Sequence, residues 1–159
     1  MAYLIDGNNF IGHISALALR DPRSKHRLIS SLRKFQKQKR TRVLVVFDGY
    51  PDPDLIGERL QEKNFSVIFP SPEQNADKII KEIISRETDL RRFFVVSSDR
   101  EIKNFAKSKG AKPLSCKDFN RKFKSTLKEH REHLEEEKRQ DTPSSLEVKQ
   151  WLKIFKDKK

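Results

Sequence analysis

Several residue types and motifs are scarce or missing from this 159-residue sequence, and each absence excludes a class of protein. The single cysteine, Cys116, excludes an internal disulfide, and no Cys/His set has the spacing of a structural zinc site. No apolar run approaches the roughly 18 residues of a membrane-spanning helix. There is no P-loop and no GxGxxG motif, which argues against a nucleotide-dependent activity. The first residues lack a basic region and a long apolar stretch, so we expect no signal peptide and a reduced, cytoplasmic location.

Three apolar runs stop at or just before an aspartate. Residues 3–5 lead into Asp6, residues 43–47 lead into Asp48, and residues 93–96 lead through two serines into Asp99. Apolar runs without alternation are typical of strands buried on both faces, as in a parallel sheet. Binding sites in such sheets form just beyond the carboxyl ends of the strands. We therefore expect these three acids to converge on one edge of a sheet.

A fourth acid, Asp77, begins a helical pattern over 76–86, with Asn75 as a suitable N-cap. Unpaired carboxylates that lie close together repel one another, so such a cluster is usually there to hold a cation. Oxygen ligands without His or Cys suit Mg²⁺ or Mn²⁺ rather than zinc. The expected metal ligands are Asp6, Asp77 and Asp99, with Asp48 assisting.

Each acid also has a structural interpretation. Asp6 precedes Gly7 and could begin a turn, and Asp48-Gly49 is itself a turn signal. Asp77 could stabilise a helix dipole from the first turn. Ser98 and Glu101 fit a capping box, which would place Asp99 at the first helical position.

The polar residues beside the acids leave similar alternatives open. Asn8 and Asn9 could bond to local backbone in an Asx turn. Ser97 and Ser98 could donate hydrogen bonds to the site or serve only as caps. Tyr50 or Phe10 could stack on a base at the rim of the site.

Four segments together resemble a known family. LIDGNN (4–9), VVFDG (45–49), NADKII (75–80) and VVSSDREI (95–102), in this order, resemble the NYN domain, a PIN-like ribonuclease fold, and in particular its bacterial YacP-like branch. The resemblance covers about residues 1–120. It implies a metal-dependent endoribonuclease site carried by Asp6, Asp48, Asp77 and Asp99, with Asn9 orienting a carboxylate. It also makes ribosome-associated RNA a candidate substrate.

The net charge of +12 is concentrated in one segment. Residues 20–42 contain ten basic residues and one acid, a net charge of +9. A basic stripe beside an acidic cluster is typical of a protein that binds a phosphate backbone and also holds metal, although a solvated helix face would look the same. The predicted RNA contacts are Arg27, Arg33, Lys34, Lys37, Arg40 and, beside Asp99, Arg100.

The order of elements predicts a three-layer α/β, PIN-like fold with a mainly parallel central sheet. The expected strands are 2–6, 42–47, 65–69, 92–97 and 112–115, and the expected helices are 9–19, 24–38, 76–86 and 98–108. This domain should occupy residues 1–120, followed by a charged helical extension over 121–159 with a break near 141–145 and a last amphipathic helix over 146–155. That last helix would pack on the domain or bind a partner.

The function predicted from these features is hydrolysis of RNA by a metal-activated water. Two other classes compete with it. A non-catalytic RNA- or ribosome-binding module would keep the basic stripe and use the acids structurally. A receiver-like phosphotransfer domain also gathers acids around Mg²⁺, but it does not explain the basic segment.

Overall fold

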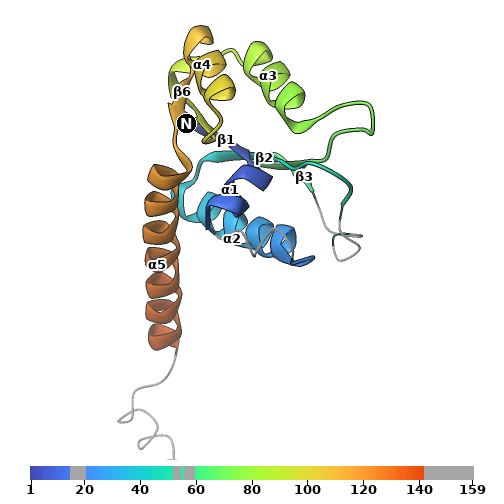
Figure 1. Cartoon of the computed structure of the whole chain (residues 1–159). Helices are drawn as coiled ribbons and strands as arrows, with labels where there is room; N and C mark the ends of the chain where they lie inside the picture. The colour runs from blue at the N-terminus through green and yellow to red at the C-terminus, as the bar shows by residue number, and fades with distance from the viewer. Residues whose placement is uncertain (15–20, 52–54, 56–59, 142–159) are drawn as a thin grey trace, which may run out of the picture.

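One six-stranded sheet forms the middle layer of the part of the chain that the computed structural model describes, residues 1–14, 21–51, 55 and 60–141 (Figure 1). The strands are β1 (Ala2–Asp6), β2 (Arg42–Val46), β3 (Gln61–Glu62), β4 (Phe65–Ile68), β5 (Phe93–Val96) and β6 (Lys112–Leu114). Their order across the sheet is β3-β4-β2-β1-β5-β6, and β3 is antiparallel to β4 while the other neighbouring pairs are parallel. The expected mainly parallel sheet is confirmed.

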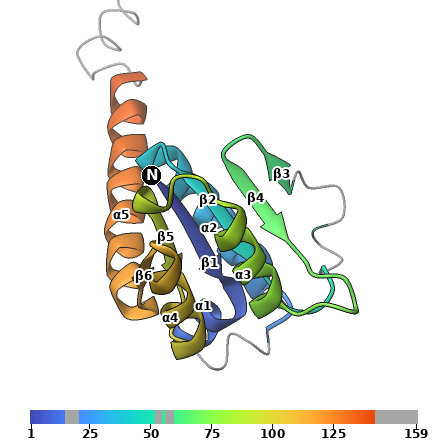
Figure 2. The same cartoon turned by 90° about the horizontal axis from the view of Figure 1, so that it is seen from above.

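Helices cover both faces of this sheet. The helices are α1 (Gly7–Ile14), α2 (Ser24–Lys39), α3 (Ala76–Arg86), α4 (Arg100–Lys109) and α5 (Cys116–Asp141), with a short 3₁₀ turn, η3 (Leu90–Arg92). Figures 1 and 2 show α3 and α4 on one face and α1 and α2 on the other, where α5 also packs. The chain therefore has the expected three layers. None of the described helices has the length and apolarity needed to cross a bilayer.

Alternate residues of β1 enter two separate cores, because successive side chains of a strand point to opposite faces. Tyr3 and Ile5 belong to the core under α1, α2 and α5, whereas Leu4 belongs to the core under α3 and α4. The first core is rich in aromatic rings. Phe119 of α5 is fully buried and its ring centroid lies 5.2 Å from that of Phe10. These contacts fix the start of α5 to the domain.

Gly7 determines how closely α1 approaches the sheet. A Cβ atom on Gly7 would lie 2.5 Å from the ring of Phe47, which is fully buried. Only a residue without a Cβ allows α1 to begin immediately after β1 at this distance.

The sequence-based elements differ from the structure in a few places. The helix expected over 9–19 begins at Gly7, and Ile14 is 46% exposed rather than buried on its stripe. The edge strand β3 was not predicted, because Gln61 and Glu62 are exposed and have no apolar pattern. Helix α4 is capped by Asp99 and not by Ser98. The cap at Asn75 is confirmed, since its side chain accepts from the Lys78 N–H at 2.9 Å.

Some predictions fall on residues outside the described part of the chain. These are the end of the first helix (15–19), part of the turn-rich stretch 48–54, and the final helix over 146–155. Helix α5 runs without interruption past residues 120 and 121. The division into 1–120 and 121–159 stays a prediction.

Candidate active site

The four predicted aspartates lie along one edge of the sheet. Asp6 is the last residue of β1, Asp48 follows β2, and Asp99 follows β5. The register is level, because Asp6 pairs with Val46 of β2 and Ile5 pairs with Val96 of β5. Asp77, in the first turn of α3, completes the group. The acids lie close enough that Asp77 and Asp48 raise the pKa of Asp6, and Asp99 and Asp48 raise the pKa of Asp77.

Asp6 is the most buried of these acids, with 7% of its surface exposed. Burial raises its pKa from 3.8 to about 6, and the charges of Asp77 and Asp48 add to the increase. Two donors act in the opposite direction: the Ser97 hydroxyl, 3.2 Å from Oδ2 of Asp6, and the backbone N–H of Asn9. Asp6 therefore lies where negative charge is poorly compensated by protein groups.

Asp77 has its pKa raised by partial desolvation and then by the charges of Asp99 and Asp48. Lys81, one helical turn further along α3, lowers it. The ammonium group of Lys81 is hydrogen-bonded to Glu101 of α4. This ion pair joins α3 and α4, and the effect of the Lys81 ammonium group on Asp77 is partly offset by the charge of Glu101.

Asp48 holds together several segments around the site. Its Oδ1 accepts from the Ala76 N–H at 3.0 Å, which fixes the beginning of α3. Its backbone N–H donates to Oδ1 of Asn8 and its carbonyl accepts from Nζ of Lys25, both at 3.0 Å. Asp48 thus combines a structural bond through one carboxylate oxygen with an exposed position at the site.

Asp99 caps α4 through a 2.8 Å hydrogen bond from the Glu101 N–H to its Oδ1. Its own backbone N–H donates to Oγ of Ser97 at 3.1 Å, and the same hydroxyl donates to Asp6. Ser97 is fully buried. Of the two roles considered for Ser97, a donor to the site or only a helix cap, the structure shows the first, because the Ser97 hydroxyl donates to the carboxylate of Asp6.

Asn9 connects the loop after β5 with the start of α5. Its Oδ1 accepts from the Ser98 N–H at 2.8 Å and from the Cys116 thiol at 3.1 Å. Burial, as the largest cause, raises the pKa of Cys116, so the thiol stays protonated and acts as a donor. The side-chain oxygens of Asn8 and Asn9 accept hydrogen bonds from distant segments, which argues against the Asx-turn alternative.

Two residues at the site were missed by sequence reasoning. Cys116 follows the short strand β6, which ends at the same edge of the sheet as β5, and this position was the available signal. Lys25 lies in the first turn of α2. Because α2 ends just before the amino end of β2, its own first turn must lie near the carboxyl edge of the sheet, and this was the available signal for Lys25. Among the described residues of the basic segment, Lys25 reaches the acid-lined edge, where it donates to the backbone carbonyl of Asp48.

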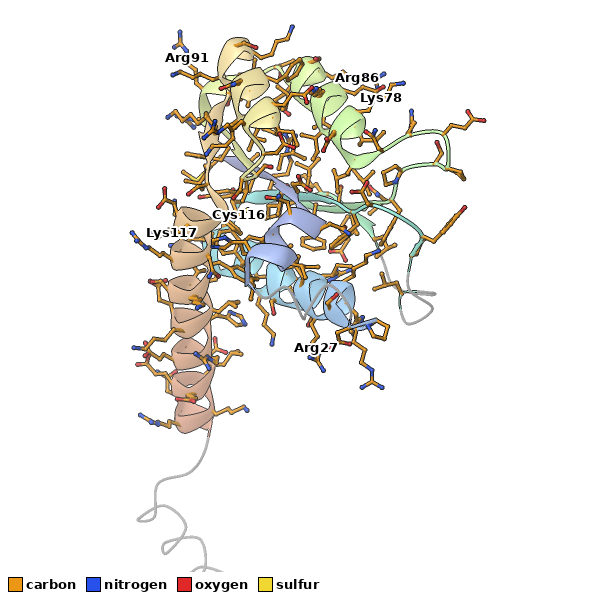
Figure 3. The ribbon with its side chains drawn as sticks, viewed as in Figure 1. Arg27, Lys78, Arg86, Arg91, Cys116 and Lys117 are labelled. Atoms are coloured by element: carbon orange, nitrogen blue, oxygen red, sulfur yellow. The ribbon has the colours of Figure 1, made fainter. Side chains whose placement is uncertain are left out.

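Most of the predicted RNA contacts are exposed side chains. Arg27, Lys34, Lys37, Arg40 and Arg100 are exposed. Figure 3 shows Arg27 projecting from α2 away from the sheet, and its guanidinium lies 3.3 Å from Asp21. The basic stripe extends from the acid-lined edge toward the opposite end of the domain, a length of about 24 Å for the 16 residues of α2.

Arg33 has a different environment. It forms an ion pair with Glu62 of β3 and its guanidinium carbon lies 4.9 Å from the centroid of the Phe65 ring. These contacts tie α2 to the β3–β4 hairpin. The proposed stacking residue Phe10 is fully buried in the core, so that prediction is wrong, whereas Tyr50 is 75% exposed.

The donor set fits a hard divalent cation, although the described residues alone do not form a closed cage. Among the described residues, no three His, Cys, Asp or Glu side chains are spaced to hold one ion. Mg²⁺ commonly binds one or two carboxylates and takes its remaining ligands from water and substrate phosphates. The raised pKa values of Asp6 and Asp77 indicate that positive charge would be favourable at this place.

A helix-covered, mainly parallel sheet with carboxylates along its carboxyl edge is the architecture of a PIN-like domain. The family described as the YacP-like NYN domain matches residues 3–156, and this chain belongs to that family. The match extends well beyond residues 1–120, the part of the sequence that contains the four motifs. NYN domains are in general ribonuclease domains, and NYN and PIN-like nucleases typically depend on a divalent metal.

Two solved structures share the fold. Rae1 (YacP) from Bacillus subtilis superimposes with a TM-score of 0.72 at 20% identity, covering 98% of this chain and 92% of that chain. Its W164L mutant gives a TM-score of 0.64 at 22% identity, with 80% and 77% covered. No curated protein sequence matches the chain.

Proposed function

We propose that this protein is a metal-dependent endoribonuclease that hydrolyses RNA phosphodiester bonds at the edge formed by Asp6, Asp48, Asp77 and Asp99. The observation that carries the proposal is the electrostatic convergence of these acids in a chain of net charge +12. A protein that only binds a polyanion gains nothing from gathering negative charge at one edge. A nuclease needs it, because carboxylates hold the cation that offsets the charge of the reacting phosphate.

Asp6, Asp77 and Asp99 would hold Mg²⁺ or Mn²⁺, with Asp48 assisting through the carboxylate oxygen that does not bond to Ala76. The bound ion supplies polarisation of the phosphate and acidification of a water ligand. The protein groups position these carboxylates: Ser97 orients Asp6, and the N-terminus of α4 orients Asp99. Asn9 fixes the distance between the loops that carry them.

The basic side chains of α2 would bind the RNA backbone without reading its sequence. Lys25, already bonded to Asp48, is suited to a phosphate close to the scissile bond. Arg100, next to Asp99, is suited to a phosphate on the opposite side of the scissile bond. The substrate would be cytoplasmic RNA, free or associated with the ribosome.

The test is cleavage of a labelled single-stranded RNA, a structured RNA and a ribosome-bound mRNA in the presence of Mg²⁺ or Mn²⁺. The variant Asp6→Asn/Asp99→Asn retains the hydrogen bond from Ser97 and a good N-cap residue for α4, so its fold should be intact. Its cleavage rate should fall roughly a hundredfold or more, the scale on which one electrostatic stabiliser acts. EDTA should abolish the activity of the wild type.

A matched control, Asp118→Asn/Glu136→Gln, removes two exposed acids on α5 and should cleave like the wild type. If the wild type binds all three RNAs and cuts none of them, the protein is a non-catalytic RNA-binding module. Retention of full activity by Asp6→Asn/Asp99→Asn would exclude the proposed site while leaving a nuclease elsewhere on the chain.

A further inference from the structure

A basic groove lies between α2 and α5, away from the acid-lined edge. It has a volume of about 450 Å³ and is lined by Ser31, Lys34, Lys124, Leu127, Lys128 and Arg131. Four of these six residues are cations, and no carboxylate is found in the part of the lining that the structure describes. Three of these cations come from α5 and therefore lie outside the basic segment 20–42 that was predicted to bind RNA.

The groove belongs to the rigid part of the domain. Leu127, at its floor, packs against the core that contains Phe119 and Phe123. His130 of α5 lies 3.4 Å from the side-chain oxygen of Gln38 of α2. Packing of Leu127 on the core and the contact between His130 and Gln38 thus hold α2 and α5 together at the groove.

The cations have a regular arrangement on α5. Lys124, Lys128 and Arg131 follow one another at intervals of four and three residues, so they share one face of the helix over roughly 10 Å. Within the described part of the chain, neither they nor Lys34 form an ion pair or a side-chain hydrogen bond. Four neighbouring cations without a protein partner repel one another, and a polyanion would relieve that repulsion.

The composition of the groove favours a phosphate backbone over a protein or a membrane. Among the lining residues that the structure describes, only Leu127 is apolar, whereas protein interfaces have an apolar, often aromatic centre. None of the described lining residues is aromatic, so they offer neither base stacking nor an anchor in a bilayer interface. Cations at fixed spacing with no base-reading group are suited to sequence-independent contact with phosphates.

The position of the groove relates it to the candidate active site. Ser31 is six residues from Lys25 on the same helix, roughly 9 Å along the helix axis. Lys25 bonds to Asp48 at the acid-lined edge. An RNA strand could therefore occupy the groove while a more distant phosphate of the same strand lies at the acids.

We propose that the groove between α2 and α5 is an anchoring site for the phosphate backbone of the RNA substrate, remote from the bond that is cut. This inference rests on the proposed function for the identity of the polyanion. Its contribution is to binding and not to the chemical step, because no hydrogen bond or ion pair joins its described lining residues to the four acids. Further along α5, beyond Arg131, the sequence becomes acidic at Glu135–Glu137.

The test compares two triple variants that remove the same charge. Lys124→Gln/Lys128→Gln/Arg131→Gln removes the α5 cations of the groove. Arg86→Gln/Arg91→Gln/Lys107→Gln removes three exposed cations elsewhere, and Figure 3 shows Arg86 and Arg91 on the α3–α4 side of the sheet. Gln is a good helix former, so both variants should fold.

Binding of a fluorescent single-stranded RNA is measured over a series of salt concentrations in the uncleaving Asp6→Asn/Asp99→Asn background. Loss of three phosphate contacts should reduce the slope of log affinity against log salt by about 2, and the control triple should change it much less. In the active protein, the groove triple should raise KM and leave kcat unchanged.

Equal salt slopes for the groove triple and the control would overturn the proposal. It would also be overturned if the groove triple kept its RNA affinity but lost binding to vesicles that contain phosphatidylserine, which would assign the groove to a membrane surface. If the wild type cuts no RNA but the slope falls as expected, the anchoring site stands and only the proposed catalytic function fails.

Discussion

The hydroxyl of Ser97 lies 3.2 Å from Oδ2 of Asp6 and donates to it, and the same oxygen accepts from the backbone N–H of Asp99 at 3.1 Å. One buried side chain thus links the ends of β1 and β5. The hydrogen bond to Asp6 favours its ionised form against the effect of burial. Ser97 therefore acts on the candidate site through Asp6, as a positioning residue.

Replacing Ser97 by Ala should raise the pKa of Asp6 above about 6 and lower the free energy of unfolding by about 1–3 kcal/mol, because the Asp99 N–H and Asp6 both lose a partner. The pKa is followed by ¹³C NMR of the carboxyl group in metal-free protein, and stability by urea denaturation. Ser97→Thr keeps the hydroxyl and should restore the pKa. An Asp6 pKa that is the same in Ser97→Ala and in the exposed-site control Ser85→Ala would contradict this role.

Asp6 itself should destabilise the fold at neutral pH. Its pKa rises from 3.8 to about 6 on folding, so between these values the native state binds more protons than the unfolded chain. The free energy of unfolding therefore falls as pH rises from about 4 through 6, by about 3 kcal/mol in total. Below the lower value both states are protonated and the effect vanishes.

Asp6→Asn removes this ionisation. We expect the variant to be about 1–3 kcal/mol more stable than wild type at pH 8 and of similar stability near pH 4. The measurement is urea denaturation at a series of pH values without divalent cations. Parallel stability curves for the two proteins over this range would contradict the assignment.

The ends of the strands were predictable because the information is local. Unbroken apolar runs before Asp6, Asp48 and Asp99 identify buried parallel strands, and parallel strands bring their carboxyl ends to one edge. The helix that carries Asp77 was predictable from Asn75 and the isoleucine spacing. What these signals have in common is that each lies within a few residues of the acid.

The contacts around the acids depend on distant segments and were not predictable. Asn9 and Cys116 are separated by 107 positions and meet only because β6 adds beside β5. The strand β3 is two exposed residues long, and it pairs because β4 lies next to it. Ser98 and Asp99 are neighbours and both are good N-cap residues, so local propensity does not decide which of them caps α4. In the structure the cap is Asp99.

A divalent cation should stabilise the wild type. At a concentration of Mg²⁺ or Mn²⁺ one hundred times the Kd, the free energy of unfolding should rise by about 2.7 kcal/mol. Asp6→Asn/Asp77→Asn removes two carboxylates whose repulsion the ion would relieve, so its stability should not respond. The measurement is thermal unfolding at constant ionic strength.

The matched control for the cation is Glu129→Gln/Glu136→Gln, which removes two exposed carboxylates of α5 and should respond to the ion like the wild type. Equal stabilisation of all three proteins would show that the ion binds away from the acid-lined edge.

Arg33 should stabilise the fold more than it contributes to RNA binding. Its guanidinium is over the Phe65 ring and paired with Glu62, so Arg33→Gln loses both a cation–π contact and an ion pair. We expect a loss of about 0.5–2 kcal/mol in urea denaturation. Lys37→Gln, an exposed residue one turn further along α2, should change stability by less than about 0.5 kcal/mol.

RNA binding should show the reverse order: Lys37→Gln, which has little effect on stability, should have the larger effect on RNA affinity. Lys37 is free to follow a phosphate, whereas the guanidinium of Arg33 is already held by the β3–β4 hairpin. We therefore expect Lys37→Gln to weaken RNA binding more than Arg33→Gln, at a salt concentration where both proteins are fully folded. If Arg33→Gln unfolds like wild type and loses RNA affinity, the guanidinium exchanges Glu62 for a phosphate, and Arg33 belongs to the RNA surface with its neighbours on α2.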